Sequence, residues 1–414
     1  MTHTPDRLRA AAQAGDNAVR LQLADRLLDE HQPLDFDPFE ALYWLEQAAT
    51  DGDVQALLRS GTMWGTGLGC DANPETARVR FETAAAGGDR DALVALAYCR
   101  EHGFGGARDP AAATIAYQRA AIGGDATALA CLAWRHESGH TLDRDPTRAA
   151  RCWSLAAAAG HPTAGERLRL LGAPAGNVAP DMTPDLAEAA PDPARALAAS
   201  APRRQVVAWE PRAFCFPGFL SEDECLHLVA AAQQQLKPSQ VVRSSGRQQR
   251  FEGRTSGEMA FVAPHKTIVV WNIEQRIARQ VLLPAEHGEP MVILRYGPGD
   301  EYVTHTDYCD PSAPGAAEFL QRGGQRVATF LVYLNDVPAG GETEFQLTGA
   351  SVKPHRAMGF LFWNVRPDGS IDPNSRHAGV PVREGQKWLA SKWIREFAPV
   401  PMQPKDPRYA VQPD

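Results

Sequence analysis

Residues 37–52 read DPFEALYWLEQAATDG, and a stretch of the same kind returns every 36 residues through the N-terminal half of the chain. Each copy opens with Asp-Pro or Asn-Pro, continues through a small Ala and a large apolar residue, and closes on Gly. The matching positions are Asp37, Asn73, Asp109 and Asp145; Ala41, Ala77, Ala113 and Ala149; Leu45, Phe81, Tyr117 and Trp153; and Gly52, Gly88, Gly124 and Gly160. Four classes of position that keep one register in four copies indicate a repeat protein.

The chemistry of each position predicts a helical hairpin. Asp or Asn before Pro caps the start of a helix and places Pro at its first position, where the missing N–H costs nothing. Ala and the large apolar residue lie on one helical stripe, and Gly ends the helix. Segments such as 53–64 and 90–103 supply the second helix, and a weaker copy lies upstream with Gly15 displaced by one. Because one hairpin cannot bury its own apolar face, the copies must stack into an α-solenoid, which we place at residues 5–172.

This repeat resembles the Sel1-like family, which is related to the tetratricopeptide repeats. The likeness is carried by WLEQAATDGDVQAL (44–57), RFETAAAGGDRDAL (80–93) and AYQRAAIGGDATAL (116–129). The family's Gly-x-Gly loop is clear in GTGLGCDANP (65–74) but degraded in SGHTLDRDP (138–146). The resemblance implies a surface that binds a protein or peptide; the alternative is that the solenoid only supports the rest of the chain.

Composition limits the classes of partner and the compartment. The 414 residues predict two or three domains, and the formal net charge of −8 argues against binding to nucleic acid or to an anionic membrane surface. No apolar run approaches the roughly 18 residues of a membrane span, and the first residues lack the apolar core of a secretory signal. Seven scattered cysteines without a CxxC pair fit reduced thiols. We therefore expect a cytoplasmic protein with no nucleic-acid partner and no membrane partner.

A second domain follows a linker. Residues 173–205 are rich in Pro, Ala and Asp and nearly free of large apolar residues, which predicts a linker with one short helix at DLAEAA (185–190). Helices are expected at 221–236, where Ser221 and Glu224 form a capping box, and at 265–282. Short runs rich in β-branched and aromatic residues follow: MVILRYG (291–297), RVATFLVYLND (326–336), MGFLFWNV (358–365) and KWLASKWIREF (387–397). The expected fold class is multidomain α + β: the α-solenoid, then a double-stranded β-helix (jelly roll) with flanking helices at 206–400, and a tail at 401–414.

Two of the twelve histidines stand in a pattern that suits a metal ion. His305 and Asp307 alternate along a strand or its edge and so project to one face, and His377 follows 72 residues later. We assign no role to the histidines of the repeats (His31, His102, His136, His140 and His161), which are expected to be surface or capping residues. Two His and one carboxylate form the facial triad of non-haem Fe(II) oxygenases. A zinc hydrolase could also use two His and one Asp with a bound water.

Lys387 favours the oxygenase. Such iron needs a two-electron co-reductant, commonly 2-oxoglutarate, whose far carboxylate needs a cation inside the barrel. Lys387 shares a strand face with Leu389 and Trp393, where an ammonium group without an anion would be a buried, unpaired charge. Hydrolysis offers no reason for such a lysine. Lys392 falls on the opposite face and is expected to be an ordinary solvated lysine.

Three motifs together resemble the prolyl 4-hydroxylase family of Fe(II)/2-oxoglutarate dioxygenases, over about residues 208–398. They are YGPGDEYVTHTDY (296–308), GGQRVATFLVYLNDVPAGGETEF (323–345) and SRHAGVPVREGQKWLASKWIRE (375–396). The resemblance implies a role for each matching residue, as follows: iron ligands His305, Asp307 and His377; 2-oxoglutarate-binding residues Lys387, Tyr296 and Thr329; and peptide-facing residues Tyr302, Arg326 and Trp393. Arg395 stands where some relatives have His. The family also implies O2 as co-substrate and L-ascorbate to sustain turnover.

The predicted function is hydroxylation of a protein or peptide, at proline in the first place, with decarboxylation of 2-oxoglutarate to succinate. The solenoid would recruit the substrate. Because Asp307 is present, hydroxylation is favoured over halogenation, which needs a small residue there. Two alternatives stay open: a Sel1-type interaction scaffold whose oxygenase domain is not catalytic, and a hydroxylase of a small metabolite.

Overall fold

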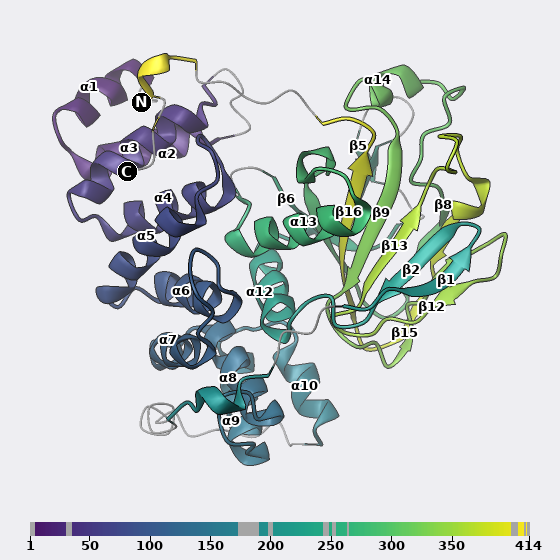
Figure 1. Cartoon of the computed structure of the whole chain (residues 1–414), viewed down its shortest axis with the longest axis horizontal. Coiled ribbons are helices and arrows are strands. Elements are labelled where there is room, and N and C mark those ends of the chain that lie inside the picture. The colour runs from purple at the N-terminus through teal and green to yellow at the C-terminus, as the bar shows by residue number, and fades with distance from the viewer. Residues whose placement is uncertain are drawn as a thin grey trace. The chain divides into compact units, whose positions relative to one another are not determined.

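The computed structural model describes residues 5–29, 35–172, 190–197, 202–242, 248–250, 254–262, 265–398, 405–409 and 411 (Figure 1). The chain divides into two compact units. The first comprises Met1–Leu197 with Ala263–Trp271 and Pro401–Asp414, and the second comprises Ala198–Val262 and Asn272–Val400.

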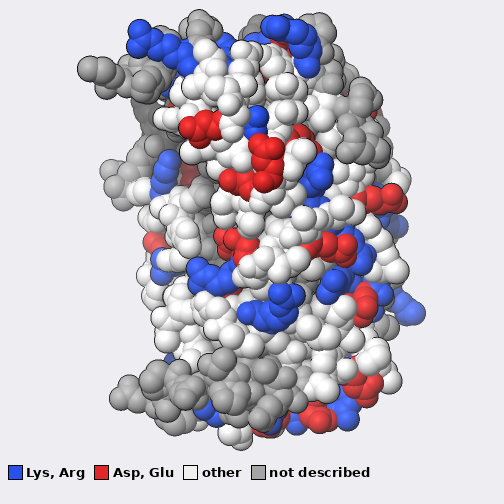
Figure 2. All heavy atoms as spheres, turned by 90° about the vertical axis from the view of Figure 1, so that its left-hand side faces the viewer, with Lys and Arg blue, Asp and Glu red and all other residues white. Residues whose placement is uncertain are grey.

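The first unit is built of helices that each contact the next helix along the chain (Figure 1). They are α1 (Pro5–Gln13), α2 (Asn17–Leu27), α3 (Pro38–Thr50), α4 (Val54–Thr66), α5 (Pro74–Ala86), α6 (Arg90–His102), α7 (Pro110–Ile122), α8 (Ala126–Ser138), α9 (Pro146–Ala158) and α10 (Ala164–Leu170). On the face drawn in Figure 2, acidic and basic side chains intermingle. No described helix is long and apolar enough to cross a membrane.

The repeat register is confirmed position by position. Asp37, Asn73, Asp109 and Asp145 each accept hydrogen bonds from the first turn of a helix that starts with Pro. The Ala and large apolar positions of all four copies are buried. The glycines that end these helices have φ between 82° and 91°, a left-handed conformation that favours Gly.

The histidines of the repeats depart from the prediction that they are surface or capping residues. His136, His140 and His161 are buried rather than on the surface. His140 contacts a buried carboxylate, so its environment is part of the interior of the array. Sequence spacing did not reveal this because the carboxylate, Glu101, belongs to an earlier repeat.

Two short pieces beyond α10 also belong to the first unit. A 3-10 turn, η1 (Pro193–Arg195), lies in the predicted linker, and a second one, η5 (Pro407–Tyr409), contacts α3 through the rings of Tyr409 and Tyr43, 5.3 Å apart. The short helix expected at 185–190 falls, except for Ala190, outside the described residues.

The second unit contains two larger antiparallel sheets, and their strand orders are as follows. The larger sheet has the order β1 (Gln205–Trp209), β2 (Arg212–Phe216), β13 (Gly359–Trp363), β9 (Arg326–Tyr333), β16 (Lys387–Arg395), β7 (Met291–Tyr296), β6 (Gly257–Phe261) and β3 (Lys237–Pro238). The smaller one has the order β12 (Ser351–Val352), β11 (Thr343–Phe345), β14 (His377–Gly379) and β8 (Tyr302–His305). Two-stranded pairs join β10 (Ala339–Gly340) to β15 (Val382–Glu384), and β4 (Gln240–Val242) to β5 (Gln248–Arg250).

A core of apolar side chains from both sheets fills the space between them. Leu294, Leu331, Phe360 and Leu389 come from the larger sheet, and Phe345 from the smaller one. Inward side chains alternate along each strand, as the pleat requires. The expected fold class, an α-solenoid joined to a two-sheet β domain with flanking helices, is thereby confirmed.

Helices α12 (Glu222–Gln233), α13 (Ile268–Val281) and α14 (Ala316–Leu320) accompany the sheets. Ser221 and Glu224 form the predicted capping box of α12. The prediction that Lys392 is solvated is wrong. This side chain is 3% exposed, and its Nζ lies 2.5 Å from Glu274 of α13. The alternation along β16 is correct, but a helix covers the outer face of the sheet there, so neither face meets water.

Candidate iron and 2-oxoglutarate site

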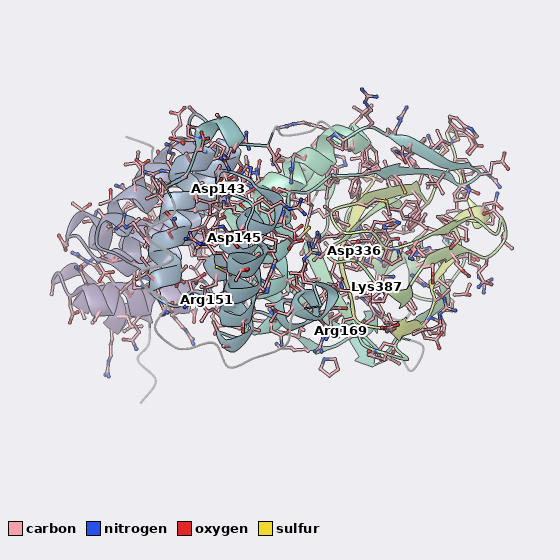
Figure 3. All side chains as sticks on the ribbon, turned by 90° about the horizontal axis from the view of Figure 1, so that it is seen from below. Asp143, Asp145, Arg151, Arg169, Asp336 and Lys387 are labelled. Carbon is pink, nitrogen blue, oxygen red and sulfur yellow. The ribbon has the colours of Figure 1, made fainter. Side chains whose placement is uncertain are left out.

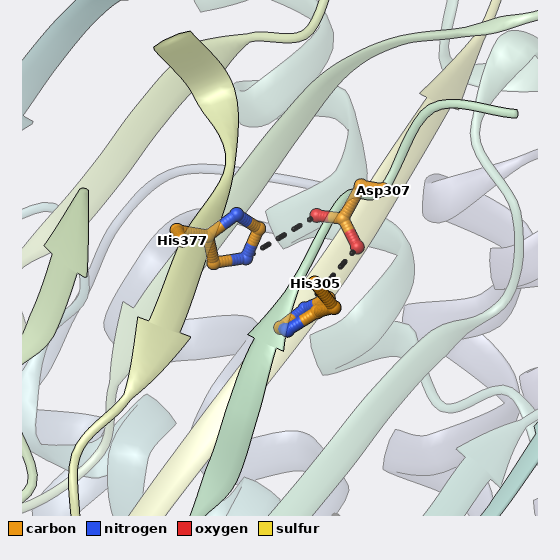
Figure 4. Close-up of side chains that lie close together, drawn as sticks. All are labelled: His305, Asp307 and His377. Carbon is orange, nitrogen blue, oxygen red and sulfur yellow. Dashed lines mark ion pairs between the residues drawn. The ribbon is translucent and has the colours of Figure 1, made fainter. Parts of the chain in front are cut away.

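His305, Asp307 and His377 come together at the edge where β8 ends (Figure 4). The pairing of β14 with β8 sets His377 opposite His305, and Asp307 follows two residues after the strand. His305 Nε2 lies 3.8 Å from Asp307 Oδ1, and His377 Nε2 lies 3.7 Å from Asp307 Oδ2. One ligand atom from each residue lies within 4.8 Å of the others, which is the spacing of side chains that share one metal ion.

Hydrogen bonds prepare both imidazoles as metal ligands. Nδ1 of His305 lies 2.9 Å from the carbonyl oxygen of Val303, and Nδ1 of His377 lies 2.9 Å from that of Ser375. Because a carbonyl only accepts, each ring donates through Nδ1 and keeps the lone pair of Nε2 free on the side of Asp307. Burial, reinforced by His377, lowers the pKa of His305 to about 3, so that this ring is neutral near pH 7.

A chain of hydrogen bonds orients the carboxylate. Thr329 Oγ1 donates to Asp307 Oδ2 at 2.7 Å, and Asn364 Nδ2 donates to Thr329 Oγ1 at 3.1 Å. Burial acts to raise the pKa of Asp307, but neighbouring groups, His377 first, hold that pKa below its usual range. The donor set, two imidazoles that each direct Nε2 toward one carboxylate, fits Fe(II).

Lys387, labelled in Figure 3, is the first residue of β16. It is 3% exposed, and its Nζ lies 5.4 Å and 5.6 Å from the ring centroids of Tyr296 and Tyr333. Burial lowers the pKa of Lys387 to about 7, although Glu342 acts to raise it. Within the described part of the chain, no hydrogen bond or ion pair joins this ammonium group to another side chain. A buried cation without a carboxylate partner fits the far carboxylate of 2-oxoglutarate.

Thr329 does not lie beside Lys387, which corrects the prediction that the two residues bind 2-oxoglutarate together. The register of β9 and β16 sets Thr329 opposite Trp393. Trp393 is six residues beyond Lys387, about 20 Å along the strand at roughly 3.3 Å per residue. The hydroxyl of Thr329 serves Asp307 instead.

Thr343 is the hydroxyl residue that the sequence reading missed. Its Oγ1 lies 2.8 Å from the hydroxyl of Tyr333, and it pairs with Gly379, where an added Cβ would lie 3.8 Å from Lys387 Nζ. A signal was present in the sequence. Thr343 stands two residues after the Gly-Gly turn of PAGGETEF, at the start of a strand that could be assigned an inward face.

A cavity of about 660 Å³ opens beside Asp307. Tyr302, Arg326 and Trp393, the residues expected to face the substrate, line it together with Arg395. The ring of Tyr302 stacks on His305 with centroids 3.6 Å apart. The cavity therefore borders the metal site on one side.

A half-buried carboxylate, Glu289, holds two arginines of this wall. Arg326 donates to both oxygens of Glu289 at 2.6 Å and 2.7 Å, and Arg395 Nε donates to the same carboxylate at 2.7 Å. The guanidinium of Arg326 lies 4.2 Å above the ring of Trp393. Burial acts to raise the pKa of Glu289, but the two arginines outweigh it and lower that pKa. Glu289 was not singled out from the sequence, since it is far from both arginines along the chain.

Three buried donors of the cavity lining have no hydrogen-bond partner within the described residues. They are Nε and Nη2 of Arg254 and Nε1 of Trp393. A buried donor left without an acceptor costs about 1–3 kcal/mol. Because both residues line the cavity, a ligand bound there lies next to donors that lack an acceptor.

Comparisons with known proteins match both halves of the chain. Residues 291–395 match the 2OG-Fe(II) oxygenase superfamily, and residues 32–53, 54–89, 90–125 and 126–161 match the Sel1 repeat. Probable prolyl 4-hydroxylase 3 of Arabidopsis thaliana is 38% identical over 211 residues, which cover 46% of this chain and 71% of the relative. Probable prolyl 4-hydroxylase 6 of the same plant is 40% identical over 209 residues, covering 45% and 70%. The crystal structure of a viral collagen prolyl hydroxylase from Paramecium Bursaria Chlorella virus-1, in its 2OG complex, shares 29% identity over 44% of this chain and 95% of that chain, with a TM-score of 0.35.

Proposed function

Because the chain belongs to the prolyl 4-hydroxylase family of Fe(II)- and 2-oxoglutarate-dependent dioxygenases, we propose that it hydroxylates prolyl residues of a protein or peptide. Decarboxylation of 2-oxoglutarate to succinate accompanies the reaction. The helical array, which belongs to a repeat class that binds proteins, recruits the substrate. L-Ascorbate sustains turnover. The seven cysteines, none of which forms a disulfide in the described structure, support a reducing, cytoplasmic compartment.

In this proposal His305, Asp307 and His377 hold Fe(II), which together with 2-oxoglutarate supplies the activation of O2 needed to hydroxylate a C–H bond. The protein contributes position and charge. Its backbone carbonyls fix which imidazole nitrogen is free, and Thr329 holds the carboxylate. Lys387 pairs with the far carboxylate of the co-substrate, with Tyr296 and Thr343 beside it.

The buried donors without a hydrogen-bond partner near the metal site favour a peptide substrate over a small metabolite. Arg254 and Trp393 offer three buried N–H groups on the wall of a 660 Å³ cavity. A peptide backbone brings a carbonyl acceptor at every residue, and the aromatic wall of Tyr302 and Trp393 suits the compact, apolar ring of proline. A free amino acid would fill only part of this space and would leave donors unsatisfied.

Lys387 weighs against the non-catalytic scaffold. Keeping an ammonium group buried without a partner is costly, and a domain that only binds proteins gains nothing from it. A co-substrate carboxylate removes that cost. The same residue distinguishes the site from that of a zinc hydrolase.

Two measurements test the proposed function. The purified protein should release succinate from 2-oxoglutarate when Fe(II) and O2 are present, and proline-containing peptides should raise that rate and gain one oxygen atom by mass spectrometry. His305→Ala serves as the matched control and should do neither. Succinate release without any modified peptide, across proline-rich and proline-free libraries, would point to the small-metabolite alternative. Absence of succinate release under all conditions would support the scaffold.

A further inference from the structure

The loop at 139–141 departs from the repeat in a way that costs stability. The two earlier copies, 67–69 and 103–105, read Gly-Leu-Gly and Gly-Phe-Gly, and their second glycines have φ of 79° and 70°. The third copy keeps the left-handed turn but places Thr141 there, at a φ of 60°. A β-branched residue in this conformation costs about 1–2 kcal/mol. His140 replaces the buried Leu or Phe of the other copies.

Both replacements contact residues 192–197, DPARAL, which we call the strap. The carbonyl of Thr141 accepts from the N–H of Asp192 at 2.6 Å, and its own N–H donates to the carbonyl of Arg195 at 3.4 Å. His140 Nδ1 accepts from the N–H of Leu197 at 3.0 Å. Arg108 Nη2 also donates to the carbonyl of Leu197, at 3.1 Å. Four polar backbone groups of the strap therefore have hydrogen-bond partners in the helical array.

One side chain of the strap is recognised as well. Arg195 forms an ion pair with Asp143, the exposed residue of the same loop labelled in Figure 3. Asp192 caps the turn η1 by accepting from the N–H of Ala194 at 2.9 Å, and Pro193 occupies the first position of that turn. The surface therefore binds an Asp-Pro turn that carries arginine at its fourth residue.

A buried network holds this surface in place. His140 is 1% exposed and its Nε2 lies 3.2 Å from both carboxylate oxygens of Glu101. Arg108 and Arg135 donate to the same carboxylate at 2.9 Å and 2.7 Å. Thr141 is fully buried, and its hydroxyl lies 2.6 Å from that of Thr114. Contacts inside the array therefore position both His140 and Thr141.

The strap itself is held weakly. Leu197 is 49% exposed, and the ion pair between Arg195 and Asp143 is open to solvent. Exposed ion pairs contribute only about 0–1 kcal/mol, and the strap buries little apolar surface. The binding surface is held in place by a buried network, whereas the strap is bound weakly. This difference favours replacement of the strap by another segment.

We propose that Arg108, His140, Thr141 and Asp143 form a docking site for an Asp-Pro-x-Arg turn of a partner protein, and that the strap fills this site in cis until the partner displaces it. The proposal rests on the proposed function only in taking the array as the part that recruits a protein. Backbone hydrogen bonds give the affinity, and the arginine gives specificity through Asp143. The partner turn and the strap compete for one set of groups.

The test uses the full-length protein and a fluorescent, end-capped peptide APDPARAL, with binding followed by anisotropy. In Arg195→Glu the strap is repelled by Asp143, so the peptide should bind about fivefold or more tightly than to the wild type, since a tethered competitor at millimolar effective concentration has been weakened. Replacement of residues 192–197 by Gly and Ser should increase binding further. His140→Phe, which restores the residue type of the second repeat, should weaken peptide binding by removing the acceptor for the Leu197 N–H.

A charge exchange tests the specificity. In the strap-replaced background, Asp143→Arg should weaken binding of the peptide about tenfold, and the peptide with Glu in place of Arg should then bind better than the original. Asp71 occupies the position equivalent to Asp143 two repeats earlier, where no strap lies against it in the described part of the chain. Asp71→Arg should leave binding unchanged.

Three results would overturn the proposal. One is a strap-replaced protein that does not bind the peptide at millimolar concentration. Another is equal binding of the Arg and Glu peptides. The third is light scattering that shows a dimer of the wild type lost on strap replacement, which would assign the site to the strap of a second copy. Succinate release without peptide should be the same in every variant, so its loss would instead count against the proposed function of the β domain.

Discussion

Replacement of Lys387 by methionine should weaken the binding of 2-oxoglutarate but stabilise the fold when 2-oxoglutarate is absent. Methionine keeps much of the volume of the side chain but removes the ammonium group. When the far carboxylate of 2-oxoglutarate is its partner, that group contributes a buried, charge-assisted contact of about 3–4 kcal/mol. At about 1.4 kcal/mol per tenfold, the apparent KM for 2-oxoglutarate should rise by about two to three orders of magnitude. Affinity for Fe(II) should change little, since Lys387 is not a ligand.

Without co-substrate the same change should stabilise the fold. Burial lowers the pKa of Lys387 from 10.5 to about 7. At about 1.4 kcal/mol per pKa unit, charging this lysine costs the folded state up to about 5 kcal/mol relative to the unfolded chain. Because the unfolded chain holds the extra proton between pH 7 and 10.5, wild-type stability should rise with pH across that window. Lys387→Met should therefore be more stable than the wild type by several kcal/mol at pH 7, and the difference should shrink toward pH 10.

Urea unfolding of the metal-free protein at several pH values, together with succinate release against 2-oxoglutarate concentration, measures both effects. Lys353→Met, at an exposed lysine of the same unit, is the control and should leave both unchanged. An unchanged KM would remove Lys387 from the co-substrate site. A loss of stability comparable with that of other core substitutions would make Lys387 a structural residue instead.

Four further predictions follow from single contacts or from one unit alone. His305→Ala should lose both Fe(II) binding and turnover, and retention of wild-type iron content would refute its role as a ligand. Thr329→Val should lower Fe(II) affinity about tenfold or more in a metal titration, with recovery in Thr329→Ser; equal affinity in all three proteins would exclude a positioning role. Lys392→Met should lower the free energy of unfolding by about 3–5 kcal/mol because it removes the buried cation that pairs with the Glu274 carboxylate, and a second change, Glu274→Leu, should recover most of it; a neutral single variant would disprove the pair. Residues 1–172 expressed alone should give helical circular dichroism and a cooperative melt, since repeat contacts are local, and a largely unfolded fragment would show that the array depends on the rest of the chain.

The array could be predicted almost completely because its information is local. A helix cap, a buried Ala and a terminal Gly each act within one hairpin, so the 36-residue register contains the whole architecture. The iron ligands were predictable for a related reason. His305 is the last residue of β8 and Asp307 follows two residues later, so the alternation of side chains along an extended chain places them together without knowledge of the sheet.

Lys392 and Thr329 were misplaced because their surroundings depend on pairing between distant elements. Alternation along β16 separates Lys392 from Lys387 correctly, but it carries no information on α13, whose Glu274 lies 118 residues earlier in the chain. Thr329 and Thr343 both lie on strands of the β domain. Only the register between strands decides which hydroxyl lies beside Asp307 and which lies near Lys387.

His140 illustrates how a departure from a pattern carries information that the pattern cannot interpret. In the sequence the third Gly-x-Gly loop departs from the pattern, and a repeat that had simply lost its function would show the same departure. The structure separates the two explanations, because a decayed loop would not keep the left-handed turn with Thr141 or hold a buried imidazole between Glu101 and the strap. Strain that is retained must be offset by contacts made elsewhere, and here those contacts are to residues 192–197. Positions that depart from the repeat pattern are therefore the first to test as binding residues of such an array.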